Sequence, residues 1–247
     1  MEWLNDVPGR GTVKRSVSDY HALAGYAAAI DPDIAVLQEV DGERAVQRVF
    51  DSTKYNIYVT RESGVQRVAL VWKKGIDLKV VGEVEALGPG GLRESPDALV
   101  KTASGSFRLL GVHLKSSCFS DKLATTRKEA CLTLREQMGI LEEWAEARQA
   151  EGVPFVMLGD FNRRFSERDD AWANLNDGSP AGFQLVAPTV GRRAGCRDGR
   201  YRDFIDHIVM SGSLAARMVP NSFQQWNYRT WDPPVLSDHC PIGVDLR

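Results

Sequence analysis

The sequence predicts an α/β protein in which two mixed β-sheets pack face to face as a sandwich, with helices on the outer faces. Three observations indicate this. Apolar runs typical of strands recur along the chain, some of them follow segments of helical periodicity, and one pair flanks a short turn at Ser104-Gly105 as a β-hairpin does. Hairpins mixed with helix-linked strands favour two packed sheets. Because the 247 residues contain no linker-like tract, we expect a single domain over residues 1–247.

The first third of the chain predicts one helix followed by three strands. Five apolar residues recur at helical spacing: Tyr20, Leu23, Ala24, Ala27 and Ile30. Ser18 is the candidate N-cap of this helix, and "DPD" at 31–33 ends it. The segments "IAVLQEV" (34–40), "YNIYVT" (55–60) and "QRVALVW" (66–72) predict strands, because they are rich in β-branched and aromatic residues.

The middle of the chain predicts a hairpin and a long helix. After a turn at "KKG" (73–75), the segment "LVKTASGSFRLLGVHLKS" (99–116) alternates apolar and polar residues on both sides of its central turn. Residues 123–150 then place apolar side chains on one face of an amphipathic helix, which "EGVP" (151–154) ends.

The last third of the chain predicts three more strands. These are "FVMLGDFN" (155–162), "DFIDHIVM" (203–210) and "CPIGVDL" (240–246), and the loops between them are rich in Gly, Asn, Asp and Arg. With these strands the two expected sheets are complete.

The overall composition is typical of a globular protein with a full core, since 43% of the residues are hydrophobic and 26% are charged. No apolar run is long enough to span a bilayer. The net charge of −2 argues against a protein held to nucleic acid mainly by a basic surface. A nucleic-acid substrate remains compatible with this charge, because a bound divalent metal supplies positive charge locally.

The four cysteines contain no CxxC pair, so zinc-type spacing is absent. Their even number allows two disulfides in three connectivities, and Cys118 and Cys131 flank a short charged loop that a local bridge would close. If Cys118–Cys131 and Cys196–Cys240 are disulfides, we expect an exported protein, either periplasmic or secreted. The segment "MEWLNDVPGR" has neither a basic n-region nor an apolar h-region, so the export signal would lie outside this chain. The compartment is therefore left open.

Polar residues of catalytic type end or interrupt apolar strands in five places: Glu39, His113, Asp160 with Asn162, Asp206, and Asp238 with His239. Each place has an ordinary interpretation when taken alone, such as a helix cap, a core histidine, an ion pair with a buried Arg, or a turn. A buried charge costs several kcal/mol unless it is paired or metal-bound, so packing does not explain five such places. Asp160 and Asn162, two residues apart, are expected on one face of an extended segment. We expect all of these residues to converge on one site.

The residue types in this set predict the metal-assisted hydrolysis of a phosphate ester. Glu39, with help from Asp238, offers the hard oxygen ligands that Mg²⁺ prefers, and Mn²⁺ is the alternative ion. His239 suits a general base that takes a proton from water, provided that the carboxylate of Asp206 fixes its tautomer. Asp160 is expected either to orient the attacking water or to support His239.

Two further residues, His113 and Asn162, are expected to donate hydrogen bonds to the charge that builds up on a phosphoryl oxygen. A Ser-His-Asp hydrolase is disfavoured, because the sequence contains no Gly-x-Ser-x-Gly motif.

The motifs "LQEV", "GVHLKS", "LGDFN", "IDHI" and "SDH", in this order, resemble those of the endonuclease/exonuclease/phosphatase superfamily, which includes deoxyribonuclease I-like enzymes. The resemblance covers nearly the whole chain. It implies a four-layer α/β sandwich, Mg²⁺-dependent cleavage of phosphodiesters or phosphomonoesters, and the roles given above to the polar residues. The "HLKS" motif with nearby cysteines is similar to that of bacterial members that are often exported.

The chain departs from the family pattern in two places. The resemblance implies a first strand that ends in a metal- or phosphate-binding Asn just before a segment like "EWLN". Because the chain begins "MEWLND", we expect that strand and its Asn to be missing. The resemblance also implies a Glu that orients the second catalytic His, and here Gln66 stands at its position. Gln66 can accept a hydrogen bond from His113 but does not stabilise an imidazolium as a carboxylate does. We therefore expect His113 to donate to a phosphate oxygen rather than to act as a general acid.

The expected substrate contacts are Arg67, Lys115 and Arg197. Arg67 is interpreted either as a phosphate contact or as half of an ion pair on a strand face. Arg197 belongs to "GRRAGCRDGRYR" (191–202), which is either a solvated loop or a cationic rim for a phosphate backbone. The main hypothesis is a monomeric phosphodiesterase or endonuclease that acts on nucleic acid. The alternatives are a phosphatase or lipid phosphodiesterase on the same scaffold, and a non-catalytic anion-binding module.

Overall fold

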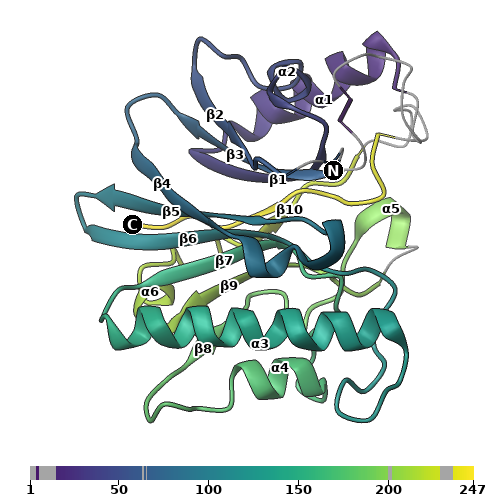
Figure 1. Cartoon of the computed structure of the whole chain (residues 1–247). Coiled ribbons are helices and arrows are strands. Elements are labelled where there is room, and N and C mark those ends of the chain that lie inside the picture. Colours follow the sequence, from purple (N-terminus) through teal and green to yellow (C-terminus); the bar gives the residue numbers. More distant parts are fainter. Residues whose placement is uncertain (1–3, 6–14, 63, 65, 200–201, 229–235) are drawn as a thin grey trace.

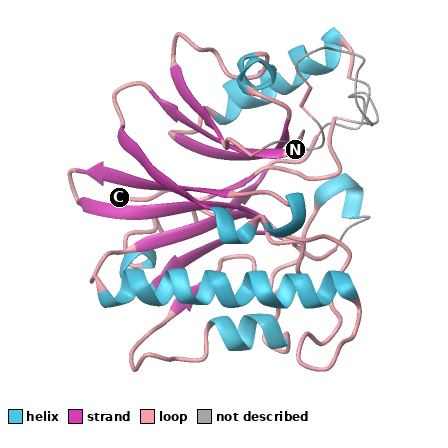
Figure 2. Cartoon of the chain, viewed as in Figure 1, coloured by secondary structure: helices cyan, strands magenta, loops and turns pink. Residues whose placement is uncertain are grey.

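Two β-sheets lie face to face between two layers of helices, as the sequence predicts (Figures 1 and 2). This is a computed structural model, and it describes the whole chain except residues 1–3, 6–14, 63, 65, 200–201 and 229–235. The layers from top to bottom of Figure 1 are helices α1 and α2, a three-stranded sheet, a six-stranded sheet, and helices α3 and α4.

The three-stranded sheet has the order β1-β3-β2, with all neighbours antiparallel. Its strands are β1 (Ile34–Val40), β2 (Tyr55–Val59) and β3 (Arg67–Lys73). Helices α1 (Val17–Ile30) and α2 (Glu43–Gln47) pack on its outer face, where they bury Tyr20, Leu23, Ala45 and Val46 in a common apolar cluster.

The six-stranded sheet has the order β4-β5-β6-β7-β9-β8 and is mixed, because β6 and β7 are parallel while the other neighbours are antiparallel. Its strands are β4 (Asp77–Val84), β5 (Ser95–Thr102), β6 (Gly105–His113), β7 (Phe155–Asp160), β8 (Leu185–Val186) and β9 (Asp206–Ser211). The short strands β10 (Gln224–Gln225) and β11 (Ile242–Gly243) form a separate antiparallel pair.

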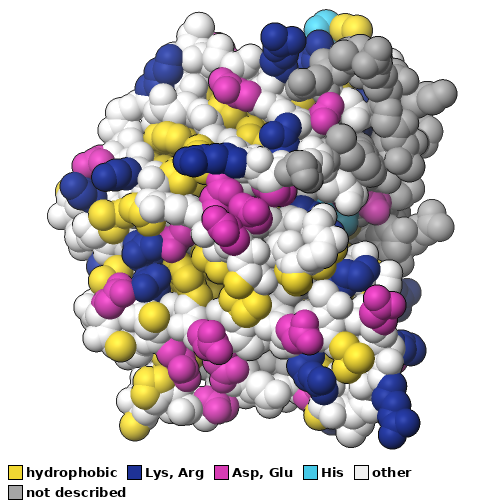
Figure 3. Space-filling model, in the orientation of Figure 1, with side chains coloured by type: hydrophobic (Ala, Val, Ile, Leu, Met, Phe, Trp, Pro, Cys, Tyr) yellow, Lys and Arg dark blue, Asp and Glu magenta, His cyan; other side chains and the backbone are white. Residues whose placement is uncertain are grey.

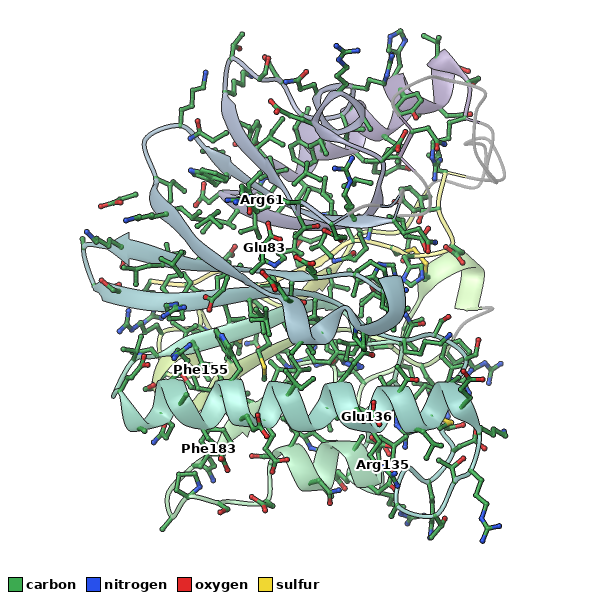
Figure 4. All side chains as sticks on the ribbon, viewed as in Figure 1. Arg61, Glu83, Arg135, Glu136, Phe155 and Phe183 are labelled. Carbon is green, nitrogen blue, oxygen red and sulfur yellow. A yellow bond between two sulfur atoms is a disulfide. The ribbon has the colours of Figure 1, made fainter. Side chains whose placement is uncertain are left out.

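Helix α3 (Glu129–Ala150) covers the outer face of the six-stranded sheet, and α4 (Asp170–Leu175) packs beside it. Phe155 of β7 and Phe183 stack on this side of the sheet with ring centroids 6.3 Å apart (Figure 4). The remaining helical segments are short: η1 (Glu85–Leu87), η2 (Pro89–Gly91), α5 (Cys196–Gly199) and α6 (Gly212–Ala215).

Several predicted boundaries differ from the structure by a few residues, and three of them are described here. The N-cap of α1 is Ser16 rather than Ser18, because Ser16 and Asp19 form a reciprocal capping box. The long helix begins at Glu129, not at residue 123, because residues 118–128 form a loop held by the buried guanidinium of Arg163, which donates to the carbonyls of Cys118 and Asp121. Only Ile242–Gly243 of the predicted strand 240–246 pairs with another strand.

Three strands were missed by the sequence analysis: the two-residue strands β8 and β10, and the longer strand β4. β4 follows the turn at 73–75 and forms the edge of the six-stranded sheet beside β5. Several of its side chains are exposed, including that of Val81, so it lacks the apolar run or clean alternation that predicts a strand. Edge strands commonly contain both apolar and charged residues.

Both predicted cysteine pairs are disulfides, Cys118–Cys131 and Cys196–Cys240. Their Cα atoms are 5.1 and 5.7 Å apart, within the range that a disulfide spans. The first closes the loop before α3, and the second joins α5 to the segment just before β11. Among the described residues, no helix is both long and apolar enough to cross a lipid bilayer.

The segment before the first helix contributes to the three-stranded sheet at one point. Leu4 is fully buried and forms a parallel bridge with Val40, and the backbone N–H of Leu4 donates to the carbonyl of Glu39 at 2.8 Å. Asp41 N–H in turn donates to the carbonyl of Leu4 at 2.8 Å. Residues 1–3 lie outside the described part of the chain, so the expected lack of the family's first strand remains a prediction.

Gly159, the residue before Asp160, provides a test of how closely β7 packs against β6 at the end of the strand. Its φ is +139°, and a Cβ atom would lie 2.1 Å from the carbonyl oxygen of Val112 in the neighbouring strand. We therefore expect Gly159→Ala to lower the free energy of unfolding by about 3 kcal/mol or more, measured by urea denaturation. Gly139→Ala in α3, where nothing lies within 4 Å, is the control and is expected to be neutral or slightly stabilising. Equal effects of the two substitutions would contradict this account.

Candidate active site

Three neighbouring strands of the six-stranded sheet carry polar residues at the same edge of the sheet. His113 at the end of β6 lies beside Asp160 at the end of β7, and Asp160 lies directly opposite Asp206, the first residue of β9. The parallel β6–β7 pair and the antiparallel β9 thus bring residues from distant parts of the sequence into one row. His113 and Asp160 are the last residues of their strands. Asp206, predicted inside a strand, is instead the first residue of β9.

The C-terminal segment adds His239 to this row. Its Nδ1 donates a hydrogen bond to Asp206 Oδ2 at 2.8 Å, and its backbone N–H is bonded to Ser237 Oγ at 3.1 Å. The side chains of His239 and Asp206 are about one-fifth exposed, at 22% and 20%. This bond fixes the imidazole ring, so that its Nε2 is the nitrogen left for proton transfer. The structure therefore brings together the pair that the sequence analysis assigned to the base and its partner.

Asn162 reaches Asp160 by a different route from the one predicted. The sequence predicts both side chains on one face of an extended segment, but Asn162 has φ +51°, in the left-handed region. This turn folds Asn162 back, so that its backbone N–H donates to Asp160 Oδ1 at 2.7 Å and its Nδ2 to Asp160 Oδ2 at 2.8 Å. Nδ2 also donates to the carbonyl of Leu114 at 3.0 Å. The two residues meet through an Asx turn rather than through strand alternation.

His113 is buried, and its Nε2 lies 3.7 Å from Asp160 Oδ2. Its Nδ1 has no hydrogen-bond partner within the described residues. Burial, together with the nearby charge of Arg93, holds the pKa of His113 well below its usual range, so the ring is neutral.

Glu39 enters the site from the other sheet. Its φ is +58°, and Gln66 Nε2 donates to its Oε1 at 3.1 Å. A small cavity of about 10 Å³, large enough for about one water-sized particle, is lined by Gln38, Glu39, Asp160 and His239. The prediction that the Gln66 side chain serves His113 is wrong, because the Gln66 amide is bonded to Glu39 instead.

Asp238 lies beside His239, with its Oδ1 3.8 Å from His239 Nε2. This oxygen is buried and has no hydrogen-bond partner among the described residues. A buried carboxylate oxygen without a donor is costly, which makes it a candidate ligand for a cation.

The carboxylates and His239 strongly affect one another's protonation. Burial, and then the charge of Asp206, raises the pKa of Asp160 to about 7. Burial also opposes the ionisation of Asp206, but the charge and hydrogen bond of His239 outweigh it and lower the pKa of Asp206. For His239, burial lowers the pKa, whereas Asp206 more than offsets this and raises it to about 10. Without a metal the site therefore holds an Asp206–His239 ion pair at neutral pH.

These donors fit a divalent cation. Oxygen atoms of Asp160 and Asp206 and a ring nitrogen of His239 lie within 4.8 Å of one another. The carboxylate of Glu39 lines the same small cavity as Asp160 and His239, and Asp238 adds the unpartnered oxygen. A set dominated by carboxylate oxygens is the one that Mg²⁺ or Mn²⁺ prefers.

Two residues near this site were missed by the sequence analysis. Arg93, in the loop before β5, donates to the carbonyl of Leu114 at 2.6 Å, while its Nε is buried without a partner within the described part of the chain. Burial lowers the pKa of Arg93, and the charges of Asp160, Glu39 and Glu62 oppose this shift. Arg93 stands in a loop between elements with no motif around it, so only the folded structure shows that it faces the carboxylates.

Asn5 is the second missed residue. It is buried, and its backbone N–H and carbonyl are both bonded to the hydroxyl of Tyr20, at 3.0 and 2.8 Å. It follows Leu4, which pairs with the end of β1 next to Glu39. The segment "EWLN" is singled out in the sequence, but no role was assigned to its Asn.

The three predicted substrate contacts differ in how the structure places them relative to the site. Lys115 directly follows Leu114 and is half-buried, so it stands next to the Asn162 and Arg93 contacts. Arg67 begins β3, and within the described residues it forms no ion pair and leaves its Nε buried without a partner. The side chain of Arg197 lies outside the described residues. On the face shown in Figure 3, basic and acidic side chains are interspersed, in keeping with the net charge of −2.

The raised pKa of His239 predicts how stability depends on pH in a chelator. A His pKa raised from 6.5 to about 10 adds stability that is complete below pH 6.5 and is lost as the pH rises toward 10. We expect the melting temperature of the unsubstituted protein to exceed that of His239→Gln most below pH 6.5, and the difference to shrink as the pH rises toward 10. A difference that stays constant over this range, measured by differential scanning fluorimetry in EDTA, would contradict the ion pair.

Comparisons with known proteins agree with this geometry. Residues 7–239 match the model of the family described as Endonuclease/Exonuclease/phosphatase family. No curated protein matches the sequence. Among solved structures, D. rerio TDP2 complexed with a single-strand DNA product is similar over 96% of this chain and 94% of its own, with 20% identity and a TM-score of 0.64.

Two further structures are similar. The human Nocturnin catalytic domain with a bound sulfate anion matches 99% of this chain and 92% of its own, with 17% identity and a TM-score of 0.61. A mannosyl-6-phosphatase of Bacteroides thetaiotaomicron matches 93% of this chain and 91% of its own, with 16% identity and a TM-score of 0.58. At these identities the three structures show a shared fold.

Proposed function

The chain belongs to the endonuclease/exonuclease/phosphatase family, and from this membership we propose that it is a Mg²⁺-dependent phosphodiesterase that cleaves nucleic acid. Membership makes the chain a metal-dependent phosphoester hydrolase. The choice of Mg²⁺, the substrate class and the role of each residue are the proposal. The observation that carries it is the Asp206–His239 pair, which stands in a row with Asp160, while His239 and Asp160 line the same small cavity as Glu39.

His239 is the general base in this proposal. Its Nδ1 is hydrogen-bonded to Asp206, so Nε2 accepts the proton of the attacking water while the water oxygen bonds to phosphorus. The ester P–O bond breaks, and the leaving ester oxygen keeps the bonding electron pair and takes a proton from solvent. Glu39 and Asp238, with Asp160, would hold the cation. When bound, the cation supplies positive charge that stabilises phosphoryl oxygens and favours the neutral form of His239.

Asn162 and His113 act through Asp160 in this proposal rather than on the phosphate itself. Both Nδ2 hydrogens of Asn162 are used, one on Asp160 and one on Leu114. His113 is buried and faces Asp160 with its Nε2. These contacts hold the Asp160 carboxylate in one orientation, which a cation ligand requires.

The cationic side chains described near the site support a phosphodiester substrate. Arg93 and Lys115 flank Leu114 at the end of β6, and Arg67 has a buried N–H without a partner within the described residues. A phosphate chain carries one charge for each link, so a row of cations binds it better than a single monoester. The TDP2 structure contains a single-strand DNA product, which also favours nucleic acid. A phosphatase is the second candidate, since the similar B. thetaiotaomicron protein is a mannosyl-6-phosphatase.

The two disulfides favour an oxidising compartment, so we also propose that the protein is exported and acts there as a monomer.

The decisive experiment compares three substrates with the same enzyme preparation: supercoiled plasmid, a single-stranded oligonucleotide and mannose 6-phosphate. We expect Mg²⁺-dependent nicking of plasmid or cleavage of the oligonucleotide, lost in EDTA and in His239→Ala, with little phosphate release from the sugar phosphate. Rapid phosphate release without DNA cleavage would establish the phosphatase instead. Anion binding with no turnover on any substrate would establish a binding module.

Arg93 provides a test of substrate contact. We expect Arg93→Met to raise the KM for an oligonucleotide by about 10-fold or more, because a partly buried guanidinium–phosphate contact is lost. Arg61→Met is the matched control, because the Arg61 side chain is 82% exposed and pairs with Glu83 at 3.8 Å (Figure 4). A changed melting temperature with an unchanged KM would mean that Arg93 is purely structural.

A further inference from the structure

Phe119 is an exposed aromatic residue whose position is fixed by its neighbours. Its exposed fraction is 36%, and no other aromatic residue in the described part of the chain is exposed to this extent. Cys118, directly before it, is fully buried and is joined to Cys131 of α3 by a disulfide. The fully buried Arg163 also donates to the carbonyl of Cys118 at 3.2 Å. Single exposed apolar residues are common on proteins, but a loop that is pinned in this way presents the Phe119 ring in one place.

The guanidinium of Arg164 lies over the Phe119 ring. Its Cζ is 5.6 Å from the ring centroid, the distance of a cation–π contact, and the backbone N–H of Arg164 donates to the carbonyl of Phe119 at 2.9 Å. Arg164 Nε also lies 3.6 Å from Asp203 Oδ2, and both of these side chains are about half exposed. Exposed ion pairs contribute little to stability, so folding does not account for this cluster. Aromatic rings and guanidinium planes are the surfaces on which proteins stack nucleobases.

The Phe119–Arg164 pair stands at the outer end of the segments that carry the candidate active site. Three segments, 113–119, 160–164 and 203–206, are joined side by side by backbone hydrogen bonds of 2.9 to 3.0 Å. Their ends at the sheet supply the row of residues described above: His113, Asp160 and Asp206. Their opposite ends supply a second row: Phe119, Arg164 and Asp203. The same three segments therefore connect the aromatic ring to the site of the chemistry.

The separation of the two rows matches a short stretch of nucleic acid. From Asp160 to Arg164 the chain advances by four residues, which span at most about 14 Å when fully extended. A nucleic-acid strand advances by about 3.4 Å for each phosphate in a helix, and by more when it is stretched. A strand whose reacting phosphate lies beside Asp160 therefore brings one of its next four or so nucleotides to Phe119.

We propose that Phe119 and Arg164 form a stacking subsite for a nucleobase of single-stranded nucleic acid. The inference rests on the proposed function, and it adds the type of strand that the enzyme binds and a contact outside the reacting phosphate. The Phe119 ring supplies the stacking surface, and Arg164 supplies a planar cation beside it. In a duplex the bases stack on one another, so only an unpaired base offers its face to the ring.

The test measures binding in Mg²⁺ by fluorescence anisotropy, with His239→Ala as the background of every variant so that the probes are not cut. The probes are two labelled strands of about ten nucleotides, an oligodeoxyadenylate and an abasic strand with the same phosphates. We expect Phe119→Ala to raise the Kd of the oligodeoxyadenylate by about 5-fold or more and to leave that of the abasic strand unchanged. Phe119→Trp should bind both strands as the background does. The matched control is Val186→Ala, which removes an exposed apolar side chain from β8 and should change neither Kd.

Three outcomes would overturn the inference. An unchanged Kd of the oligodeoxyadenylate in Phe119→Ala would show that the ring does not contact a base. Equal weakening of both strands, with a lowered melting temperature, would show that Phe119 only supports its loop. Tighter binding of a duplex than of the single strand would show that unpaired bases are not what the subsite binds. Failure of the proposed function is seen separately, because the enzyme with His239 intact would then cleave neither strand while the difference between the two Kd values would persist.

Discussion

Replacing His239 by Ala is expected to lower kcat for Mg²⁺-dependent phosphodiester hydrolysis by about 10²- to 10⁴-fold, the usual contribution of a general base. The reason is geometric. The Nδ1 of His239 is held by Asp206 at 2.8 Å, and the ring stands beside the cavity that Glu39 and Asp160 line. No other histidine in the described part of the chain has this position, since His113 and His207 are fully buried and His21 lies exposed on α1. The measurement is the single-turnover rate on an oligonucleotide at saturating Mg²⁺.

The control for this substitution is His21→Ala, which removes an exposed imidazole from α1 and is expected to leave the rate unchanged. Asp206→Asn retains a side chain of the same shape but loses the charge that favours the correct tautomer and the imidazolium. We expect its rate to lie between those of the wild type and His239→Ala. If His239→Ala kept more than about one-tenth of the activity, the base would have to be another group, and the proposed mechanism would fail.

The strand-end residues show why much of the site was predictable. His113, Asp160 and Asp206 each stand where an apolar run meets a polar residue, and a buried charge in such a place is costly enough to signal a function. The two-sheet fold was also predictable, because the hairpin at 102–105 and the strands linked by α3 follow simple periodicities of apolar residues. The features that were predicted are therefore those that local sequence patterns determine.

The features that were missed depend on contacts between distant segments. The start of α3 is set by Arg163, which lies more than 30 residues later and holds the loop before the helix. Gln66 was assigned to His113 by its place in a motif, yet the fold brings its amide to Glu39. Arg93 has no motif at all. A side chain's place in a sequence pattern fixes its element, but its partner is decided by how the two sheets pack.

Replacing Glu39 by Gln is expected to weaken Mg²⁺ binding by at least about 10²-fold and to lower activity by a similar factor at limiting Mg²⁺. Glu39 is the one site carboxylate supplied by the three-stranded sheet, so its loss removes the cation's link between the two sheets. The amide of Gln66 donates to Glu39 Oε1 and so helps to orient this carboxylate. The measurement is the rise in melting temperature with Mg²⁺ concentration, which reports affinity without requiring turnover.

The design of this experiment separates the loss of a ligand from a general loss of negative charge. Glu136→Gln on the exposed face of α3 removes the same charge far from the site and should leave the Mg²⁺-induced rise intact. Gln66→Ala should weaken the rise less than Glu39→Gln does, because it removes only the hydrogen bond that orients the ligand. An unchanged Mg²⁺ response in Glu39→Gln would move the cation to Asp160, Asp206 and Asp238 alone. The two sheets would then contribute unequally to catalysis, with the three-stranded sheet serving only to close the site.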